Sequence, residues 1–149
     1  MPRVRRSADV TWEGSVARGQ GSISGRSGAL SGLGYSLATR VGEPEGKTSP
    51  EELLAAAHAG CFAMSLSTEL TKAGTPPQRL TVSATCTLDE VEGKGHRIVR
   101  MEIDAHGRAA GADAEAFAEA ARAADAGCTF SHLLRASAHV TVNATLEES

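Results

Sequence analysis

One stretch, residues 48–74, constrains the fold more than any other because it carries a complete set of helix signals. Ser49 can serve as the N-cap, Pro50 suits the first helical position, where no amide hydrogen bond is needed, and Glu52 completes an S-x-x-E capping box. Apolar side chains then recur at helical spacing, and Gly74 ends the pattern. We therefore predict a helix over residues 48–74, in which Glu51 keeps a free carboxylate.

The middle of this helix has little polar character. Between Leu53 and Leu66 nearly every residue is apolar or small, which predicts burial almost all round the helix. A chain of 149 residues can enclose such a helix only with cover from sheets, from another helix or from a second subunit.

Composition excludes several classes of protein. A net charge of −3 and a pI of about 5.9 argue against a nucleic-acid or anionic-membrane partner, and the short basic cluster Arg3, Arg5 and Arg6 does not overturn that balance. No apolar run approaches the roughly 20 residues of a transmembrane helix, and the N-terminus lacks the apolar region of a signal peptide, so we expect a soluble, cytoplasmic protein. Three cysteines, an odd number, argue against a secreted disulfide framework and for redox-active or buried thiols.

The rest of the chain alternates between strand and helix patterns. We predict strands over 3–13, 35–41, 80–90, 97–106 and 136–146, a hairpin or meander in the Gly/Ser-rich region 14–34, a helix over 112–126 that Gly127 ends as a left-handed cap, and further helical turns over 129–135. Single helices between runs of strands favour an α+β fold over a parallel doubly wound sheet. No repeat or linker divides the sequence, so we expect one domain over residues 1–149.

Cys61 is the thiol within the long helix. A thiol reacts as the thiolate, and a cation, a helix N-terminus or a metal must lower its pKa from about 8.5 for the thiolate to form at neutral pH. Cys61 lies about three turns inside the helix, where the helix dipole has little effect, so it needs an arginine. Arg40 and Arg18 precede the helix, and the carboxylate of Glu51 could hold a guanidinium in a fixed orientation.

Helix geometry restricts how these residues can cooperate. Glu51 and Cys61 are ten positions apart, about 15 Å along an unbroken helix, so they cannot meet within one chain. We therefore hypothesise a symmetric dimer with antiparallel helices, in which Arg40 and Glu51 of one subunit serve Cys61 of the other.

Plainer interpretations stay open for these residues. A lone cysteine on an apolar helix can be an inert core residue, and Glu51 can be a favourable charge in a first helical turn. Cys86 falls on the core face of a predicted strand, whereas Cys128 follows a helix-ending glycine on a more open segment suited to redox use. We interpret His58 as a core histidine rather than a base, and the sequence has no ligand spacing typical of zinc.

Six short motifs are spread over nearly the whole chain. They are WEG at 12–14, RGxG at 18–21, SGxL at 27–30, TR at 39–40, AGC at 126–128 and, most specific, PEELLAAAHAGCFAMSLS at 50–67. Together they resemble those of the OsmC/Ohr superfamily of organic hydroperoxide resistance proteins, and of its OsmC branch in particular. The resemblance implies an α+β fold and an intertwined homodimer. In this dimer a long buried central helix is flanked by antiparallel sheets, and the sites lie at the subunit interface.

The same resemblance implies a thiol peroxidase that reduces organic hydroperoxides, acts as an antioxidant in stress responses, and needs no metal or other cofactor. Cys61 would attack the peroxide as a thiolate and become a sulfenic acid, which Cys128 would resolve to a disulfide for a dithiol reductant, such as a lipoyl-bearing protein, to reduce. The family's arginine and glutamate match Arg40 and Glu51. The Ohr branch carries its arginine nearer the N-terminus, which makes Arg18 the alternative.

One position departs from the resemblance. Relatives often have proline directly after the resolving cysteine, where this chain has Thr129. A looser turn at Cys128 is therefore expected, and it could slow thiol exchange.

Two other functions are compatible with these residues. A non-enzymatic protein could hold an apolar small molecule in a dimer cleft lined by Phe62, Met64 and Phe130. A thiol redox sensor would share the chemistry of Cys61 and Cys128, although the sequence has no DNA-binding motif through which to act.

Overall fold

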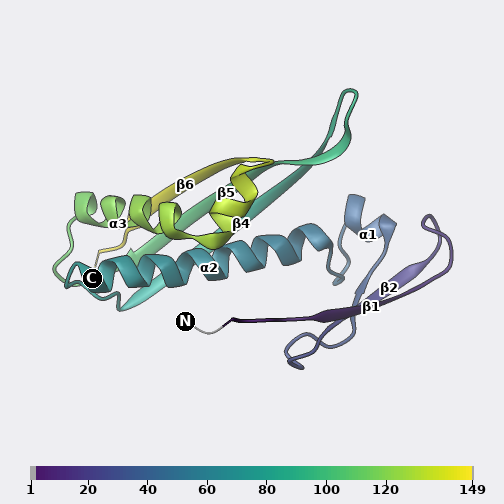
Figure 1. The fold of residues 1–149 in the computed structure, drawn as a ribbon, viewed down its shortest axis with the longest axis horizontal. Coiled ribbons are helices and arrows are strands. Elements are labelled where there is room, and N and C mark those ends of the chain that lie inside the picture. Colours follow the sequence, from purple (N-terminus) through teal and green to yellow (C-terminus); the bar gives the residue numbers. More distant parts are fainter. Residues whose placement is uncertain (1–2, 149) are drawn as a thin grey trace. The chain divides into compact units, whose positions relative to one another are not determined.

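The computed structural model describes residues 3–148, which fall into two compact units that divide between Leu53 and Leu54. The elements, in chain order, are β1 (Ala8–Glu13), β2 (Gln20–Gly25), β3 (Leu33–Tyr35), α1 (Leu37–Val41), α2 (Pro50–Lys72), β4 (Arg79–Val91), β5 (Gly95–Arg108), α3 (Ala114–Gly127), α4 (Thr129–Arg135) and β6 (His139–Leu146) (Figure 1). The predicted α+β class is confirmed.

The first unit is built on an antiparallel meander in the order β1-β2-β3, as the Gly/Ser-rich region predicted. Its register places Trp12 beside Gly21 and Gly21 beside Tyr35. The two aromatic rings meet over Gly21 with their centroids 5.4 Å apart, and a Cβ at Gly21 would lie only 2.8 Å from the Trp12 ring. Glycine is therefore required here for the aromatic pair to close over the sheet.

The predicted strand over 35–41 is wrong, because most of it forms helix α1. Ser36 is the N-cap: its hydroxyl accepts a hydrogen bond from the amide of Thr39, and the Thr39 hydroxyl accepts one from the amide of Ser36. This reciprocal capping outweighs the weak strand pattern and places Arg40 on a helix.

The second unit contains an antiparallel hairpin of β4 and β5, which confirm the strands predicted over 80–90 and 97–106, with β6 on the other side of β5. β6 runs parallel to β5, so the expectation of purely antiparallel sheets is wrong. Two helices, α3 and α4, connect β5 to β6, and a connection of this length allows the chain to return in the same direction. The core lies between this sheet and the helices, and its largest buried side chains are Phe62, Leu66, Leu70, Met101, Ile103 and Phe117.

Helix α2 confirms the long predicted helix and its N-cap. The amide of Glu52 donates to the hydroxyl oxygen of Ser49 at 3.1 Å. The carboxylate of Glu52 accepts from the hydroxyl of Thr48 at 2.7 Å instead of closing the box on Ser49. The cap therefore does not use the carboxylate of Glu51, as the sequence predicted.

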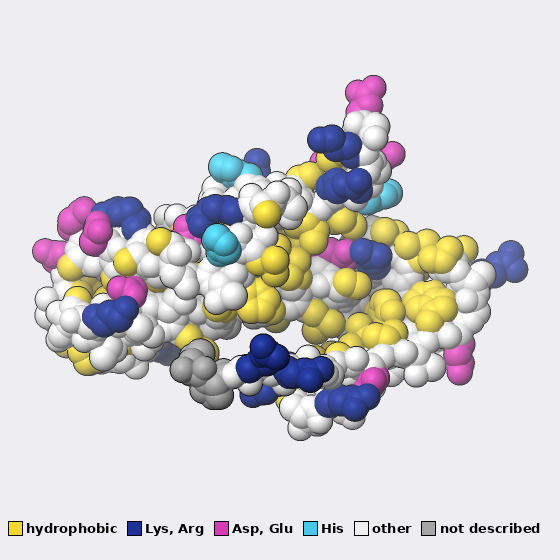
Figure 2. Space-filling model, viewed as in Figure 1, with side chains coloured by type: hydrophobic (Ala, Val, Ile, Leu, Met, Phe, Trp, Pro, Cys, Tyr) yellow, Lys and Arg dark blue, Asp and Glu magenta, His cyan; other side chains and the backbone are white. Residues whose placement is uncertain are grey.

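Burial of α2 follows a single stripe rather than the whole circumference. The buried residues recur every fourth position, at His58, Phe62, Leu66 and Leu70. On another face Met64 is 74% exposed, and hydrophobic side chains reach the surface over α2 in Figure 2. The expectation of burial nearly all round is therefore wrong for the described residues of the single chain.

The 23 residues of α2 also correct the expectation about apolar runs. Among the described residues this helix is long and apolar enough, by length and composition, to cross a membrane, with a mean hydropathy of 1.2 over 18 residues. The core helix of a soluble protein meets the same criteria.

The junction of α3 and α4 differs from the predicted glycine cap. Gly127 is the last helical residue of α3, and its φ is not positive. The helix ends at Cys128, whose extended backbone (φ −75°, ψ 119°) makes it both the C-cap of α3 and the N-cap of α4. The thiol of Cys128 is therefore fixed at the point where the chain turns from one helix into the next.

Candidate functional site

The structure brings Cys61 and Cys128 together although they are far apart in the sequence. Both are free thiols and belong to the second unit, and the Cys128 thiol is close enough to hydrogen-bond with that of Cys61. Cys128 is fully buried within the core cluster, whereas Cys61 is half-buried and packs against that cluster. The third thiol, Cys86, is half-buried on strand β4.

Some groups around Cys61 raise the pKa of its thiol and others lower it. Burial raises the pKa of Cys61 most strongly, and the neighbouring Cys128 raises it further. The backbone N–H groups of Phe130 and Thr129 lower it, because they stabilise the thiolate by hydrogen bonding. The net result is a raised pKa, so the described chain by itself keeps Cys61 protonated.

The two amides were not found in the sequence analysis. The first turn of α4 directs its free N–H groups to the thiol of Cys61. The motif AGC followed by helical turns at 129–135 contains the signal, since a cysteine at a helix N-cap stands beside free amides. Because proline has no N–H, Thr129 supplies an amide that proline could not.

Arg40 and Glu51 form an ion pair within the first unit. The Arg40 Nε donates to both carboxylate oxygens of Glu51, at 3.0 and 3.1 Å, and Nη2 donates to Oε1 at 2.5 Å. The carboxylate is 14% exposed and the guanidinium side chain 38% exposed. Glu51 thus fixes the orientation of Arg40 and leaves part of the guanidinium accessible.

The pair also sets the protonation of both groups. Burial acts to raise the pKa of Glu51, but hydrogen bonds from Arg40 and from its own amide outweigh burial, and the pKa falls below its ordinary value. The pKa of Arg40 is raised, chiefly by the hydrogen bond to Glu51. Both groups are therefore charged at neutral pH.

A small cleft of about 230 Å³ lies beside Arg40 in the first unit. Its walls are mostly apolar or aromatic and are formed by Trp12, Val16, Tyr35, Ser36, Leu37 and Arg40. Arg18 lies exposed in the turn between β1 and β2 and does not line this cleft. The structure thus joins Glu51 to Arg40, and among the described residues no carboxylate pairs with Arg18.

The three residues expected to line an apolar cleft of the dimer, Phe62, Met64 and Phe130, differ in burial within the described chain. Phe62 is fully buried in the core, and Phe130 packs against the same core. Met64 is exposed on another face of α2. His58 is fully buried, which confirms its interpretation as a core histidine.

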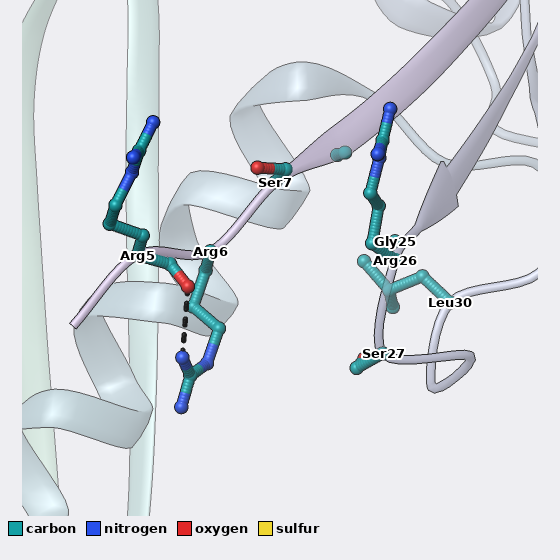
Figure 3. Close-up of a pocket in the computed structure, with 8 residues that line it drawn as sticks. Arg5, Arg6, Ser7, Gly25, Arg26, Ser27 and Leu30 are labelled. Atoms are coloured by element: carbon teal, nitrogen blue, oxygen red, sulfur yellow. Dashed lines mark hydrogen bonds between the residues drawn. The ribbon is translucent and has the colours of Figure 1, made fainter.

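A broader cleft of about 840 Å³ in the first unit is lined by basic residues. Arg26 is paired with Asp9, and Arg6 donates to the carbonyl of Arg5. In Figure 3 the guanidinium groups of Arg5 and Arg26 point the same way from separate places, and that of Arg6 points the opposite way, so the three do not converge on one anion. Within residues 3–148, no group of three or more His, Cys, Asp or Glu side chains is arranged to hold a metal ion.

Comparison with known proteins places this arrangement in a family. The profile of the family described as OsmC-like protein matches residues 42–143. The chain is 38% identical over 133 residues to Peroxiredoxin OsmC of Escherichia coli, covering 89% of this chain and 92% of that protein, with the same figures for Peroxiredoxin OsmC of Shigella flexneri.

Solved structures share the fold at lower identity. An organic hydroperoxide resistance protein OsmC from Legionella pneumophila superposes with a TM-score of 0.69 at 18% identity, covering 98% of this chain and 100% of that one. The organic hydroperoxide resistance protein OhrB of Bacillus subtilis gives 0.68 at 23% identity, covering 95% and 98%. On the family match and the identity to curated relatives, the chain belongs to the OsmC branch of the OsmC/Ohr superfamily.

Proposed function

We propose that this protein is a thiol-dependent peroxidase that reduces organic hydroperoxides to alcohols. Relatives named peroxiredoxin support a peroxidase-type role. The observation that carries the proposal is the contact between the thiols of Cys61 and Cys128, because a two-cysteine peroxidase needs a second thiol within reach of the first.

The reaction has two sulfur steps. The Cys61 thiolate attacks the outer peroxide oxygen, the O–O bond breaks, and the alkoxide leaves as an alcohol after taking a proton, so that Cys61 becomes a sulfenic acid. The sulfur of Cys128 then attacks the Cys61 sulfur, the S–O bond breaks, and water leaves with the thiol proton. A dithiol reductant, for which a lipoyl-bearing protein is one candidate, returns the disulfide to two thiols.

Exposure supports the assignment of the two roles. Cys61 is partly accessible, whereas Cys128 is fully buried behind it. A peroxide that arrives from solvent therefore reaches Cys61 first, and Cys128 meets only the oxidised sulfur.

A second subunit completes the site in this proposal. No group acting on the Cys61 thiol within the described chain is a cation, and its pKa is raised. We assign the missing cation to Arg40, oriented by Glu51, of the partner in a homodimer, with Arg18 as the alternative. The uncovered face of α2 supports such an assembly, since a second copy can bury it.

The cleft beside Arg40 suits the organic part of the substrate. Trp12 and Tyr35 give it an aromatic wall, and the accessible part of the guanidinium can hold the peroxide oxygens. We place the enzyme in the cytoplasm as a soluble, single-domain subunit, with no nucleic-acid or membrane partner.

Intact mass spectrometry after titration with cumene hydroperoxide tests the mechanism. The wild type is expected to lose two hydrogens as the Cys61–Cys128 disulfide forms, and neither Cys61→Ser nor Cys128→Ser should do so. Cys86→Ser is the matched control and should behave as the wild type. A Cys61→Ser protein that still consumes hydroperoxide would refute the proposal.

A further inference from the structure

A buried polar pair lies next to the thiols and has no part in the reaction described above. Nε2 of His58 and Oγ of Ser131 are 2.8 Å apart, and both residues are fully buried. His58 belongs to α2 and Ser131 to α4. This hydrogen bond therefore joins two helices from distant parts of the sequence.

Each partner of the His58–Ser131 bond stands one helical turn from a redox thiol. His58 precedes Cys61 by three positions in α2, and Ser131 follows Cys128 by three positions at the start of α4. Residues three apart share a helix face, so the bond and the thiol pair join the same two helix surfaces. Any rotation or shift of α4 along α2 would disturb both contacts together.

A second contact ties α3 into the same cluster. Asp125 of α3 pairs through Oδ2 with Arg135 of α4, and its Oδ1 is buried without a partner among the described residues. Nδ1 of His58 is likewise buried and unpartnered among the described residues, and besides burial the charges of Asp125 and Arg135 act on the pKa of this ring in opposite directions. The Asp125–Arg135 pair therefore joins α3 to α4 next to the buried ring.

The hydrogen bond between His58 and Ser131 adds little to the free energy of unfolding, because burying two polar groups costs nearly as much as their bond contributes. A buried hydrogen bond is nearly balanced by the loss of water, whereas its strict geometry fixes the two helices in one arrangement. That arrangement decides whether the Cys128 sulfur can approach the Cys61 sulfur and whether the Thr129 and Phe130 amides face it.

We propose that His58 is a positioning residue: through Ser131 it holds the first turn of α4 on α2, so that the Cys128 thiol is aligned with the sulfur of Cys61 for disulfide formation. The proposal rests on the peroxidase reaction proposed above. His58 itself touches no reacting atom in that reaction.

Three variants and their controls separate positioning from simple support of the core. Ser131→Ala and His58→Leu remove the bond, whereas His58→Gln retains a polar atom at the end of the side chain and can restore it. The controls are Ser137→Ala and His132→Gln, which make the same chemical changes at exposed positions close by. The double variant His58→Leu with Ser131→Ala leaves neither polar group orphaned in the core, so it should fold even if His58→Leu alone does not.

Rapid mixing of each reduced protein with cumene hydroperoxide, with dimedone present, measures the two sulfur steps separately. Dimedone traps the Cys61 sulfenic acid that Cys128 has not yet resolved, so its yield reports the rate of resolution. We expect resolution to slow by about tenfold or more in Ser131→Ala and in the double variant, and to recover in His58→Gln, because small misplacements of reacting groups have effects of this size. Sulfenic acid formation should change much less.

Two results would overturn the proposal. One is a wild-type rate of resolution in Ser131→Ala and in the double variant; the other is a His58→Gln protein that resolves no faster than the double variant. If the wild type forms no sulfenic acid, the proposed function fails, and the alignment is then tested on the disulfide made with diamide. Its reduction potential should be less negative in Ser131→Ala than in the wild type and Ser137→Ala, and an unchanged potential would refute the positioning role.

Discussion

Mixed dimers test whether the cation that serves Cys61 comes from the other subunit. One subunit carries Cys61→Ser and keeps Arg40; its partner carries Arg40→Ala and keeps Cys61. If each site combines Cys61 of one subunit with Arg40 of the other, the mixed dimer contains one complete site and one site that lacks both groups. If each site uses groups of one chain, neither site is complete.

The expected activity follows from the helix geometry. Glu51, which holds Arg40, and Cys61 are ten positions apart in α2, about 15 Å along the helix axis, and on this spacing we proposed that Arg40 serves Cys61 of the partner. Co-expression with two different affinity tags and purification on both gives the mixed dimer alone. Its hydroperoxide reductase activity per dimer should be about half that of the wild type, because one of two symmetric sites is intact.

Both parent proteins provide the baseline for this assay. The Cys61→Ser dimer should be inactive, and the Arg40→Ala dimer should have lost most of its activity, since its thiol pKa is no longer lowered by a cation. Activity of the mixed dimer no higher than that of the parents would refute the shared site. Replacing Arg40→Ala by Arg18→Ala in the same design tests the alternative arginine: an Arg18→Ala parent dimer with full activity would eliminate Arg18.

Three further predictions concern protonation. Glu51→Gln should lower the free energy of unfolding, measured in urea, by about 1 kcal/mol at neutral pH. Since the pKa of Glu51 is lowered in the fold, the wild type should lose this advantage as the pH falls from 4.5 through the folded pKa. A difference between wild type and variant that is equal at neutral pH and below the folded pKa would contradict the assignment. Thr129→Pro should raise the pKa of Cys61, measured by the pH dependence of alkylation, because one amide is removed at a helix position that accepts proline, whereas Thr129→Ala, which keeps the amide, should not. The pKa of His58 is lowered by burial, so its contribution to stability should be complete above pH 6.5 and decline as the pH falls below that value, and this slope should be absent in His58→Gln.

The helices and strands that depend on neighbouring residues could be predicted from the sequence. The N-cap of α2 at Ser49, the strands β4 and β5, and the helical turns of α4 after Cys128 were all predicted from patterns of neighbouring residues. The strand predicted at 35–41 is helix α1 because Ser36 and Thr39 form a capping box, which is also a local signal. The parallel placement of β6 could not be predicted, since a sequence pattern does not give the direction in which a strand pairs.

In the candidate site, too, contacts between residues near in sequence could be predicted and contacts between distant residues could not. The Arg40–Glu51 pair could be anticipated because its members are near in sequence and the capping of the helix leaves Glu51 free. The thiol contact came only from the family resemblance, since nothing near Cys61 or Cys128 in the sequence points to the other. Their surroundings, the His58–Ser131 bond among them, depend on how distant helices pack and have no sequence signal of their own.

The groups around Cys61 indicate why a second subunit would be used to activate it. Within the described chain, burial and Cys128 outweigh the two amides, and the thiol stays protonated. A protonated thiol reacts slowly with peroxides, so an unassembled chain would be protected from oxidation while its site is incomplete. The Arg40–Glu51 pair, already formed within its own chain, would need no rearrangement to supply the missing positive charge. Assembly would then complete the site and ionise the thiol in a single step, which ties peroxidase activity to the dimer.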